Sequence, residues 1–286
     1  MFLMSLAIVL FIPGIVWVAG FIARRRFHAL VMADVNELFA RAGRGVDTRS
    51  FAVRCASLPE PVRRYVRYAV GQDAPIVRTA RLHHGGFFRT DPKGRWLPIK
   101  GQEFFTISEP GFVWNATISL RPFLWIEAQD QFIDGRGNML VKFCSLFTLV
   151  NANGEELDQG ALLRWLAEVV WFPIGYLSGR ISWDPIDSRT AQATLTHNGL
   201  SVIAKVEIDQ EGRLVNVRGL RYQVENGRSK LTPWKGACKC YREFGGMRIP
   251  TSVEVLWELS EGDFSYAKFE VTSVEYDSGD CRPVTL

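Results

Sequence analysis

The stretch TAQATLTHNGLSVIAKVEI, residues 190–208, decides the fold class of this chain. On both sides of Asn198 and Gly199, apolar and polar side chains alternate in the way that is typical of half-buried strands. Asn and Gly accept the positive φ angles of a two-residue turn, so this pair is a strong hairpin signal. The stretch therefore predicts two antiparallel strands, over residues 190–196 and 200–208, joined by a tight turn.

The same pattern repeats from Ile76 onward. Strand-like segments, such as 214–224 and 252–259, lie between short turns that contain Gly, Asn, Asp or Pro. Regularly spaced strands with tight turns between them indicate an antiparallel meander. One turn, Asp134–Gly137, resembles part of a calcium loop but lacks the remaining carboxylates, so we interpret it as a hairpin.

A short helix is predicted before the strands. The segment Leu58–Pro61 is typical of a helix start, and Gly71 ends the helix. An apolar stripe follows one face, while Arg63, Arg64 and Arg67 lie on the other. Two interpretations are open: the arginines face water on a helix that packs against the sheet, or they contact lipid phosphates.

A second helix is predicted among the strands, over residues 161–171, and Pro173 stops it. Apolar side chains cover nearly its whole circumference, so we expect this helix to be buried. It nevertheless carries Arg164 and Glu168, which lie four residues apart on one face. The two form either an ordinary ion pair on the one solvent-exposed face of the helix or a polar spot inside a mostly apolar cavity.

The N-terminal segment predicts a membrane anchor. Residues 2–23 contain no charged side chain, and Arg24, Arg25 and Arg26 follow directly. At a rise of ~1.5 Å per residue this run makes a helix of ~33 Å, which is long enough to cross a bilayer core. A cleavable signal peptide is disfavoured because no basic residue precedes the run. Since basic residues prefer the cytoplasmic side, we expect a single-pass protein of the cell membrane with its body in the cytoplasm.

Charge and cysteine usage agree with this orientation. Between residues 24 and 95 the chain has fifteen Lys and Arg against six Asp and Glu, whereas the net charge of the whole chain is +4. A basic region beside the anchor suits an anionic inner leaflet. The five cysteines form no disulfide framework, which fits a reducing compartment.

Together these segments predict an α+β fold. We expect a transmembrane anchor with its basic flank at 1–26, a juxtamembrane helix and connector at 27–57, and a single domain at 58–286. The domain is expected to be a curved, mainly antiparallel β-meander resembling a half-barrel. The short helix precedes the meander, and the buried helix is inserted in it.

The residues that carry chemistry form no recognised catalytic motif. Of the four histidines, His83 and His84 are neighbours on a predicted strand and would point to opposite faces. No zincin, P-loop, dinucleotide-binding, nucleophile-elbow or EF-hand motif occurs. We therefore predict no catalytic residue, metal site or cofactor. Nucleic acid is not expected as a partner, because the chain beyond its membrane-proximal region is slightly negative.

Several segments carry a resemblance to a known family. They are 58–65 (LPEPVRRY), 112–116 (FVWNA), 134–137 (DGRG), 163–168 (LRWLAE), 171–173 (WFP), 233–234 (PW) and 249–257 (IPTSVEVLW). Together they resemble an uncharacterised bacterial family of membrane-anchored proteins, which implies no activity. The predicted architecture is also similar to lipoprotein carriers of the LolA/LolB type, where a curved half-barrel holds acyl chains. Those carriers work in the periplasm, whereas the arginines after the anchor predict the cytoplasmic side.

The leading hypothesis is a membrane-anchored binding protein that holds an apolar or amphipathic, lipid-like ligand on the concave face of the sheet. Arg164 and Glu168 are the expected polar contacts. The candidate wall residues, which would otherwise be core, are Trp114, Trp125, Trp165 and Trp257. The residues expected at the surface of the partner bilayer are Arg24, Arg25, Arg26, Arg63, Arg64 and Arg67.

Two alternatives remain open at this point. The first is an enzyme that acts on a membrane-derived substrate, with Glu168 or Asp130 as general base, and it requires a second titratable group nearby. The second is a non-catalytic structural or assembly protein, which requires a filled core.

Overall fold

We describe the protein from a computed structural model. It describes residues 2–43, 51–71, 77–225 and 228–277, with side chains from Val18 onward. In this part of the chain one antiparallel sheet contains thirteen strands, in the order β6-β5-β4-β3-β2-β1-β13-β12-β11-β10-β9-β8-β7. The strands are β1 Thr79–Phe88, β2 Leu97–Thr106, β3 Gly111–Arg121, β4 Leu124–Ile133, β5 Arg136–Phe143, β6 Phe147–Asn153, β7 Ile181–Pro185, β8 Thr190–His197, β9 Leu200–Ile208, β10 Leu214–Glu225, β11 Arg228–Phe244, β12 Met247–Leu259 and β13 Gly262–Asp277.

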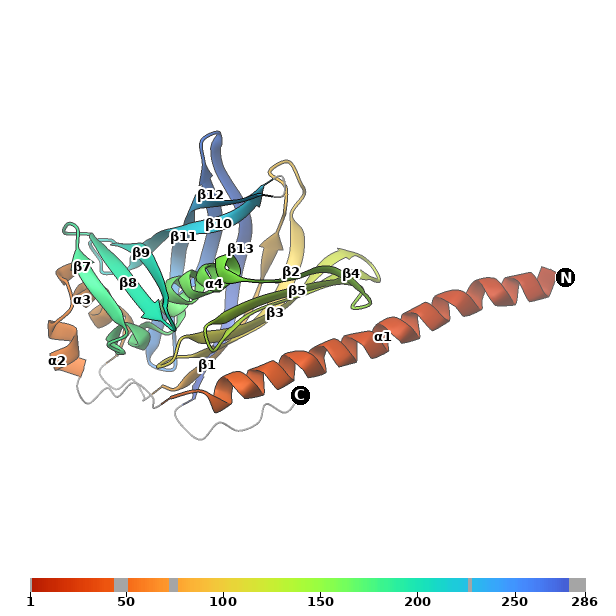
Figure 1. Ribbon diagram of the computed structural model, residues 1–286, viewed down its shortest axis with the longest axis horizontal. Coiled ribbons are helices and arrows are strands. Elements are labelled where there is room, and N and C mark those ends of the chain that lie inside the picture. The colour runs from red at the N-terminus through yellow and green to blue at the C-terminus, as the bar shows by residue number, and fades with distance from the viewer. Residues whose placement is uncertain (1, 44–50, 72–76, 226–227, 278–286) are drawn as a thin grey trace.

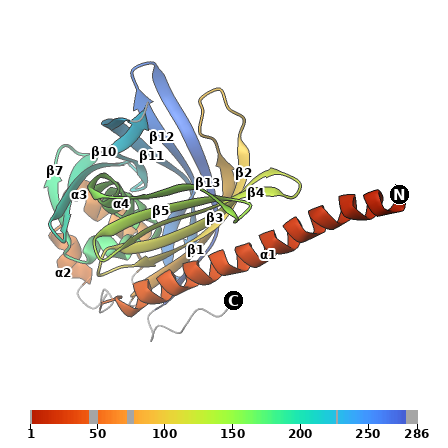
Figure 2. The same ribbon diagram turned by 45° about the vertical axis from the view of Figure 1, so that its right-hand side comes forward.

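The sheet is curved and unclosed, because its edge strands β6 and β7 do not pair with each other. The chain passes between these two edges through the helix α4 (Glu155–Glu168) and two 3-10 turns, η2 (Val169–Trp171) and η3 (Pro173–Leu177). Figure 1 shows α4 inside the concavity, and Figure 2 shows how the sheet bends around it. The helix contacts β5 on one half of the sheet and β9 and β10 on the other. It therefore bridges the two arms of the sheet, whose free edges β6 and β7 are not paired with each other.

The buried helix is confirmed, and it forms the centre of the main core. Trp165 on α4 is fully buried, and its indole Nε1 donates to the carbonyl oxygen of Thr106 at 3.0 Å. Phe172 packs between Trp165 and Phe105, with ring centroids 5.6 Å and 4.8 Å away. The helix begins at Glu155, earlier than predicted, because acidic residues in its first turn favour a helix N-terminus.

The predicted short helix is also confirmed, as α3 (Glu60–Ala69), and α2 (Phe51–Ala56) precedes it. α3 buries Val62, Tyr65 and Val66, and it contacts β9 and β12. Both helices lie at the end of the molecule opposite the N-terminus (Figure 1).

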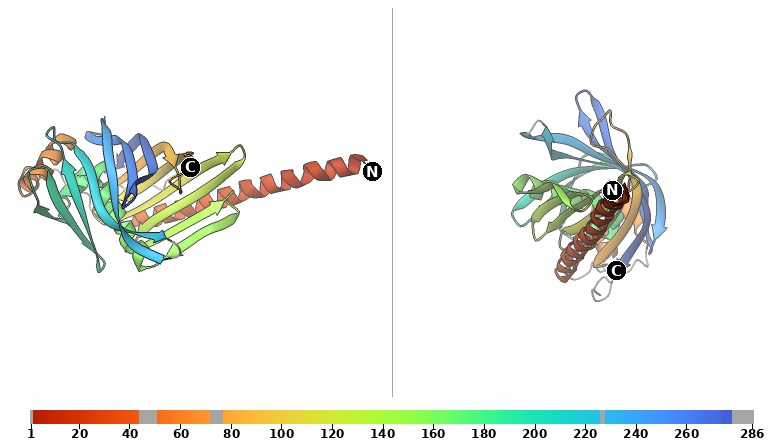
Figure 3. Two further views of the ribbon diagram at one scale, coloured as in Figure 1. Left: turned by 90° about the horizontal axis from the view of Figure 1, so that it is seen from above. Right: turned by 90° about the vertical axis from the view of Figure 1, so that its right-hand side faces the viewer.

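The N-terminal helix α1 runs without a break from Phe2 to Ala40. Its later half packs on the outer face of the sheet, where Phe27, Val31 and Val35 form a second apolar cluster with Phe104 and Val113. The earlier half extends beyond the sheet (Figure 3). The predicted helix after the anchor is therefore a continuation of the same helix.

Within the described residues, no helix combines the length and the apolar character that crossing a bilayer requires. The predicted anchor at 2–23 falls mostly on residues before Val18, whose side chains lie outside the described part. The transmembrane anchor therefore stays a prediction.

Both predicted hairpin turns are confirmed. Asn198 and Gly199 join β8 to β9 with φ angles of 48° and 82°, and Asp134 and Gly135 join β4 to β5 with 53° and 79°. All four residues lie in the left-handed region that a type I′ turn requires. The expected α+β class, with a curved antiparallel meander, a short preceding helix and an inserted buried helix, agrees with this architecture.

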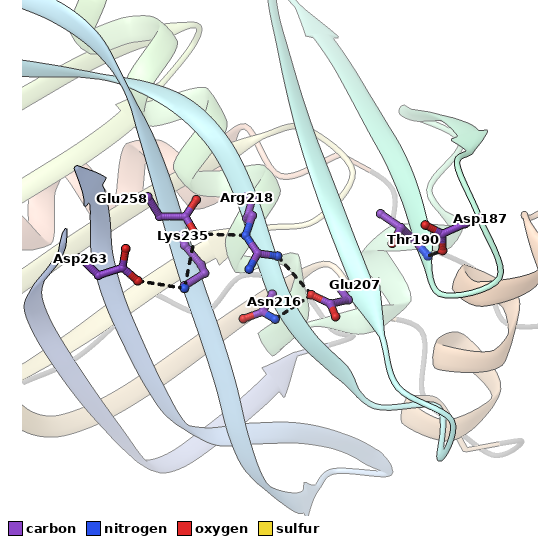
Figure 4. Close-up of polar contacts among 8 residues, drawn as sticks. All are labelled: Asp187, Thr190, Glu207, Asn216, Arg218, Lys235, Glu258 and Asp263. Atoms are coloured by element: carbon purple, nitrogen blue, oxygen red, sulfur yellow. Dashed lines mark hydrogen bonds and ion pairs between the residues drawn. The ribbon is translucent and has the colours of Figure 1, made fainter. Parts of the chain in front are cut away.

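The outer face of strands β9 to β13 carries charged side chains that pair across neighbouring strands (Figure 4). Arg218 on β10 pairs with Glu207 on β9 at 3.1 Å and with Glu258 on β12 at 3.2 Å. Lys235 on β11 lies 3.4 Å from Glu258 and 3.3 Å from Asp263 on β13. Because these side chains are partly solvated, each pair contributes little to stability, and together the pairs keep this face polar.

Candidate ligand-binding cavity

A cavity of about 380 Å³ lies on the concave side of the sheet, between α4 and both halves. Its volume falls within the range of ~300–1,000 Å³ that is typical of small-molecule sites. Most of the side chains around it are apolar. The lining consists of Phe88, Thr90, Trp114, Ile118, Ile126, Ala128, Gln129, Asp130, Met139, Val141, Leu149, Val150, Arg164, Glu168, Arg221, Trp234, Val255, Tyr266, Ala267 and Phe269.

One row across three strands carries polar side chains at the wall of this cavity and beside it. Glu103 on β2 is the register partner of Trp114 on β3, and Trp114 is the partner of Asp130 on β4. Directly paired residues of an antiparallel sheet point to the same face. The row therefore presents two carboxyl groups, one on each side of an indole, to the helix in the concavity.

Arg164 on α4 binds both carboxyl groups of the row and a third on its own helix. Its Nη2 lies 2.7 Å from Glu103 Oε1, its Nη1 2.7 Å from Asp130 Oδ2, and its Nε 2.8 Å from Glu168 Oε1. The guanidinium carbon lies 5.1 Å from the ring centroid of Trp114, within the range of a cation–π contact. We call Glu103, Asp130, Arg164 and Glu168 the Arg164 cluster.

Burial changes the protonation of the Arg164 cluster. Loss of water raises the pKa of Glu103 well above its ordinary value, and the nearby Glu168 and Asp130 add to this rise, while Arg164 opposes it. Burial also raises the pKa of Glu168, against the opposing effect of Arg164. The rise is larger for Glu103 than for Glu168, so we assign a proton to the carboxyl group of Glu103.

Two oxygen atoms of the cluster have no hydrogen-bond donor. They are Asp130 Oδ1 and Glu168 Oε2, and both are buried. Buried polar atoms in proteins are almost always paired, so two unpaired acceptors beside one cavity are an unusual feature of this site.

A buried histidine holds the indole of the row. Trp114 Nε1 donates to His84 Nε2 at 2.9 Å, and since an indole nitrogen can only donate, the proton of the imidazole is on Nδ1, next to the carbonyl oxygen of Gly85 at 3.2 Å. Burial lowers the pKa of His84 to about 4, so the ring is neutral at pH 7. No local pattern identified His84 as a site residue, because its partner Trp114 lies 30 positions further along the chain.

Comparison with known proteins identifies the family of this chain. A family model described as "Family of unknown function (DUF6544)" matches residues 52–269. The chain belongs to this family. The expected membership of an uncharacterised family is therefore confirmed, and the matched region of this DUF6544 protein includes the whole Arg164 cluster. No curated protein matches the chain.

Two solved structures are similar to this DUF6544 protein. One is a LolA superfamily protein from Nitrosomonas europaea, with 11% identity over 76% of this chain and 92% of that chain, and a TM-score of 0.38. The other is a beta-barrel-like protein of domain of unknown function DUF1849 from Brucella abortus, with 8% identity over 71% of this chain and 99% of that chain, and a TM-score of 0.24.

The structure brings only some of the predicted ligand-binding residues together. Trp114, Arg164 and Glu168 line the cavity. Trp125 lies on the outer face, where its indole donates to Ser145 Oγ at 3.1 Å. Two further predicted wall residues do not line the cavity: Trp165 is in the core of this family member, and Trp257 stacks on Tyr266, with ring centroids 5.9 Å apart.

Glu103 was not predicted as a site residue. The only signal for it is a single carboxylate inside the apolar segment that ends β2, and its importance depends on pairing with strands that are distant in the chain. Asp130 was considered only as a base, because nothing in the sequence spacing pairs it with Glu168. Among the described residues, no group of three His, Cys, Asp or Glu side chains is arranged to hold a metal ion.

The arginines expected at a membrane surface lie in two separate places. Arg24 is bound to the outer face of the sheet, with its Nε 3.0 Å from Glu127 Oε1, and Arg25 lies over the ring of Phe21. Arg26 lines a groove between α1 and the end of β5. The arginines of α3 are at the opposite end of the molecule (Figure 1), where Arg64 pairs with Glu60, so the two groups do not form one surface. The arginines of α3 are Arg63, Arg64 and Arg67.

Proposed function

We propose that this protein binds an apolar or amphipathic, lipid-like ligand in the cavity of its concave face. The observation that carries this proposal is the pairing of a mostly apolar cavity with a buried charged cluster at its wall. Apolar walls supply affinity for a hydrocarbon body, and a few fixed polar groups orient a head group. A purely structural protein would instead fill this space with side chains, since protein interiors are close-packed.

An enzyme is the second candidate, and one observation favours it. Glu168 and Asp130 lie on the same guanidinium, so each candidate base has another titratable group close by. However, one oxygen of each carboxylate is already bound to Arg164, and the described lining of the cavity contains no Ser, Cys, His or Lys. Binding therefore remains the function that this geometry supports best.

We further propose that the ligand comes from a bilayer to which the protein is anchored. Two hairpin tips beside α1 support this, because Phe123 and Phe147 are 81% and 65% exposed there. A side-chain carbon at Gly20 would lie within 4 Å of both Trp125 and Cys144, so α1 passes these tips just after the apolar residues 2–17. Exposed aromatic side chains next to an apolar segment are typical of contact with a membrane interface.

The test of ligand binding uses the full chain, extracted in mild detergent and examined by native mass spectrometry. We expect bound lipid in the wild type and its loss in Ala128→Trp, because Ala128 lines the cavity and a large indole would fill it. Ile203→Trp is the matched control, since Ile203 is 51% exposed on the outer face. A wild-type protein that folds and carries no lipid, or an Ala128→Trp variant that retains it, would contradict the proposal.

The side of the membrane needs a separate experiment. We propose a cytoplasmic body, on the basis of Arg24, Arg25 and Arg26 at the end of the apolar run. A reporter enzyme that is active only in the cytoplasm, fused after Leu286, is expected to be active. Activity only of a periplasmic reporter at the same position would reverse the orientation and leave the binding proposal in place.

A further inference from the structure

The chemistry of the head group can be inferred from what the Arg164 cluster lacks, if the proposed binding function holds. Asp130 is 3% exposed, and its Oδ2 is bound to Arg164 while its Oδ1 has no donor. Glu168 has the same arrangement, with Oε1 on the guanidinium and Oε2 without a partner. Both residues line the cavity. Two acceptors beside the cavity therefore lack hydrogen-bond donors.

The cluster also has fewer positive groups than carboxyl groups. Three carboxyl groups surround the single guanidinium of Arg164, and all of them are nearly or fully removed from water. Even with Glu103 protonated, as its raised pKa favours, the two carboxyl groups of Asp130 and Glu168 face a single guanidinium. Buried charge without an equal and opposite partner is unfavourable, so the site is suited to one more cation.

The nearest other cation does not supply what is missing. Arg221 on β10 lines the cavity, but its guanidinium carbon lies 6.0 Å from the ring centroid of Trp234, in a cation–π contact. Its Nε would lie 3.5 Å from a side-chain carbon at Gly160, one helical turn before Arg164. Among the described contacts, none joins Arg221 to Asp130 or Glu168.

We propose that the cavity binds an amphipathic molecule whose head group is a protonated primary amine, held by Asp130 and Glu168. A primary ammonium brings one positive charge and three N–H donors, which matches the missing charge and exceeds the two missing donors. A carboxylate head would instead add a third negative charge, and a hydroxyl would bring one donor and no charge. The hydrocarbon part of the ligand lies along the apolar lining, where Trp114 and Trp234 provide aromatic surface.

Photoaffinity labelling of the full chain tests this assignment. Three probes share one ten-carbon chain with a diazirine at its middle and differ only in the head: a primary amine, an alcohol or a carboxylate. Labelled peptides are identified by mass spectrometry, so probe that partitions into detergent is separated from probe in the cavity. At pH 7 we expect the amine to label peptides of β4, β5 and α4 about tenfold more than the alcohol does, which is the effect of a charge-assisted hydrogen bond.

Variants show which residues recognise the amine. Asp130→Asn keeps an oxygen for Arg164 and removes the negative charge, so labelling by the amine should fall about tenfold while labelling by the alcohol is unchanged. Glu168→Gln should act in the same direction and serves as a second variant if Asp130→Asn does not fold. Glu258→Gln is the matched control, because it removes the same charge on the outer face.

The outcomes separate this inference from the proposed function. Equal or stronger labelling of the cavity peptides by the alcohol or the carboxylate would overturn the amine assignment and leave a lipid-binding cavity. Labelling of those peptides by none of the three probes would contradict both. Two further probes of equal chain length, a lysophosphatidylethanolamine and a lysophosphatidylcholine, identify the source of the amine. Preference for the first supports a lipid head group, and labelling by the alkylamine alone supports a free amine.

Discussion

Arg164 Nη2 on α4 lies 2.7 Å from Glu103 Oε1 on β2, although the two residues are 61 positions apart in the chain. The contact sets the rotation of α4 within the concavity, because the same guanidinium also binds Asp130 on β4. The helix that joins the two halves of an unclosed sheet is therefore held by charge as well as by apolar packing. It also explains why a predominantly apolar helix carries an arginine at a buried position.

Replacing Arg164 by Met should destabilise the fold strongly. The change leaves buried carboxylates without a counter-ion, and we expect a loss of about 3–5 kcal/mol in the free energy of unfolding, measured by chemical denaturation. Arg218→Met is the control, because Arg218 pairs with carboxylates on the solvated outer face and should cost no more than about 1 kcal/mol. Equal losses in the two variants would contradict the structural role of the Arg164 cluster.

Glu103→Gln should change how stability depends on pH. The folded-state pKa of Glu103 is raised, so above the ordinary value of 4.5 the unfolded chain releases its proton while the folded protein keeps it. The stability of the wild type therefore falls as pH rises through this window. Gln keeps the shape of the protonated acid and does not titrate, so the variant should become steadily more stable relative to the wild type from about pH 5 upward. Parallel curves for the two proteins would argue against a protonated Glu103.

His84 should produce the opposite slope on the acid side. Its folded-state pKa of about 4 lies below the ordinary value of 6.5. Between pH 4 and pH 6.5 the unfolded chain therefore binds a proton that the folded protein does not bind. Stability is then fully present above pH 6.5 and falls by up to about 3 kcal/mol as pH decreases towards 4. His84→Gln keeps an acceptor for Trp114 but does not titrate, so it should flatten this part of the curve in denaturation measured at several pH values. The half-buried His83 is the control position, where a change to Gln should leave the slope intact.

A partly buried ion pair adds to the apolar contact between α1 and the sheet. Arg24 lies 3.0 Å from Glu127, whose side chain is 0% exposed. Arg24→Ala should loosen α1 and cost about 1–3 kcal/mol, because it leaves a buried carboxylate unpaired, while Arg24→Ala with Glu127→Gln should recover part of this loss. Hydrogen exchange of residues 24–40 in the full chain measures the loosening. Additive effects of the two changes would show that the pair is not coupled.

Much of the fold was predictable because its signals are local. Alternation identified the strands around Asn198 and Gly199, and a two-residue turn needs only the backbone freedom of its own residues. The buried helix was predictable from its apolar circumference, since every residue that defines its burial lies within a few turns. Pairing of Arg164 with Glu168 is likewise a consequence of helical spacing.

The candidate site was predictable only in part. Arg164, Glu168 and Trp114 were identified, whereas Glu103 and His84 were not, and Trp165 was assigned to a wall although it lies in the core. A tryptophan in a helix has the same sequence signature whether it faces a cavity or a close-packed interior. The choice depends on how the helix is rotated against the sheet, and no local pattern records that rotation.

The sequence by itself determined the antiparallel strands, their turns, the helix in the concavity and the apolar N-terminal run, because each depends on the conformational preferences of neighbouring residues. Only the tertiary structure decided that Glu103, Asp130 and Glu168 share one guanidinium and that a cavity lies beside them. That arrangement depends on strand register across β2, β3 and β4 and on the packing of α4 against both halves of the sheet. The free energy of these long-range contacts, which oppose the desolvation of four ionisable groups, is a property of the whole fold.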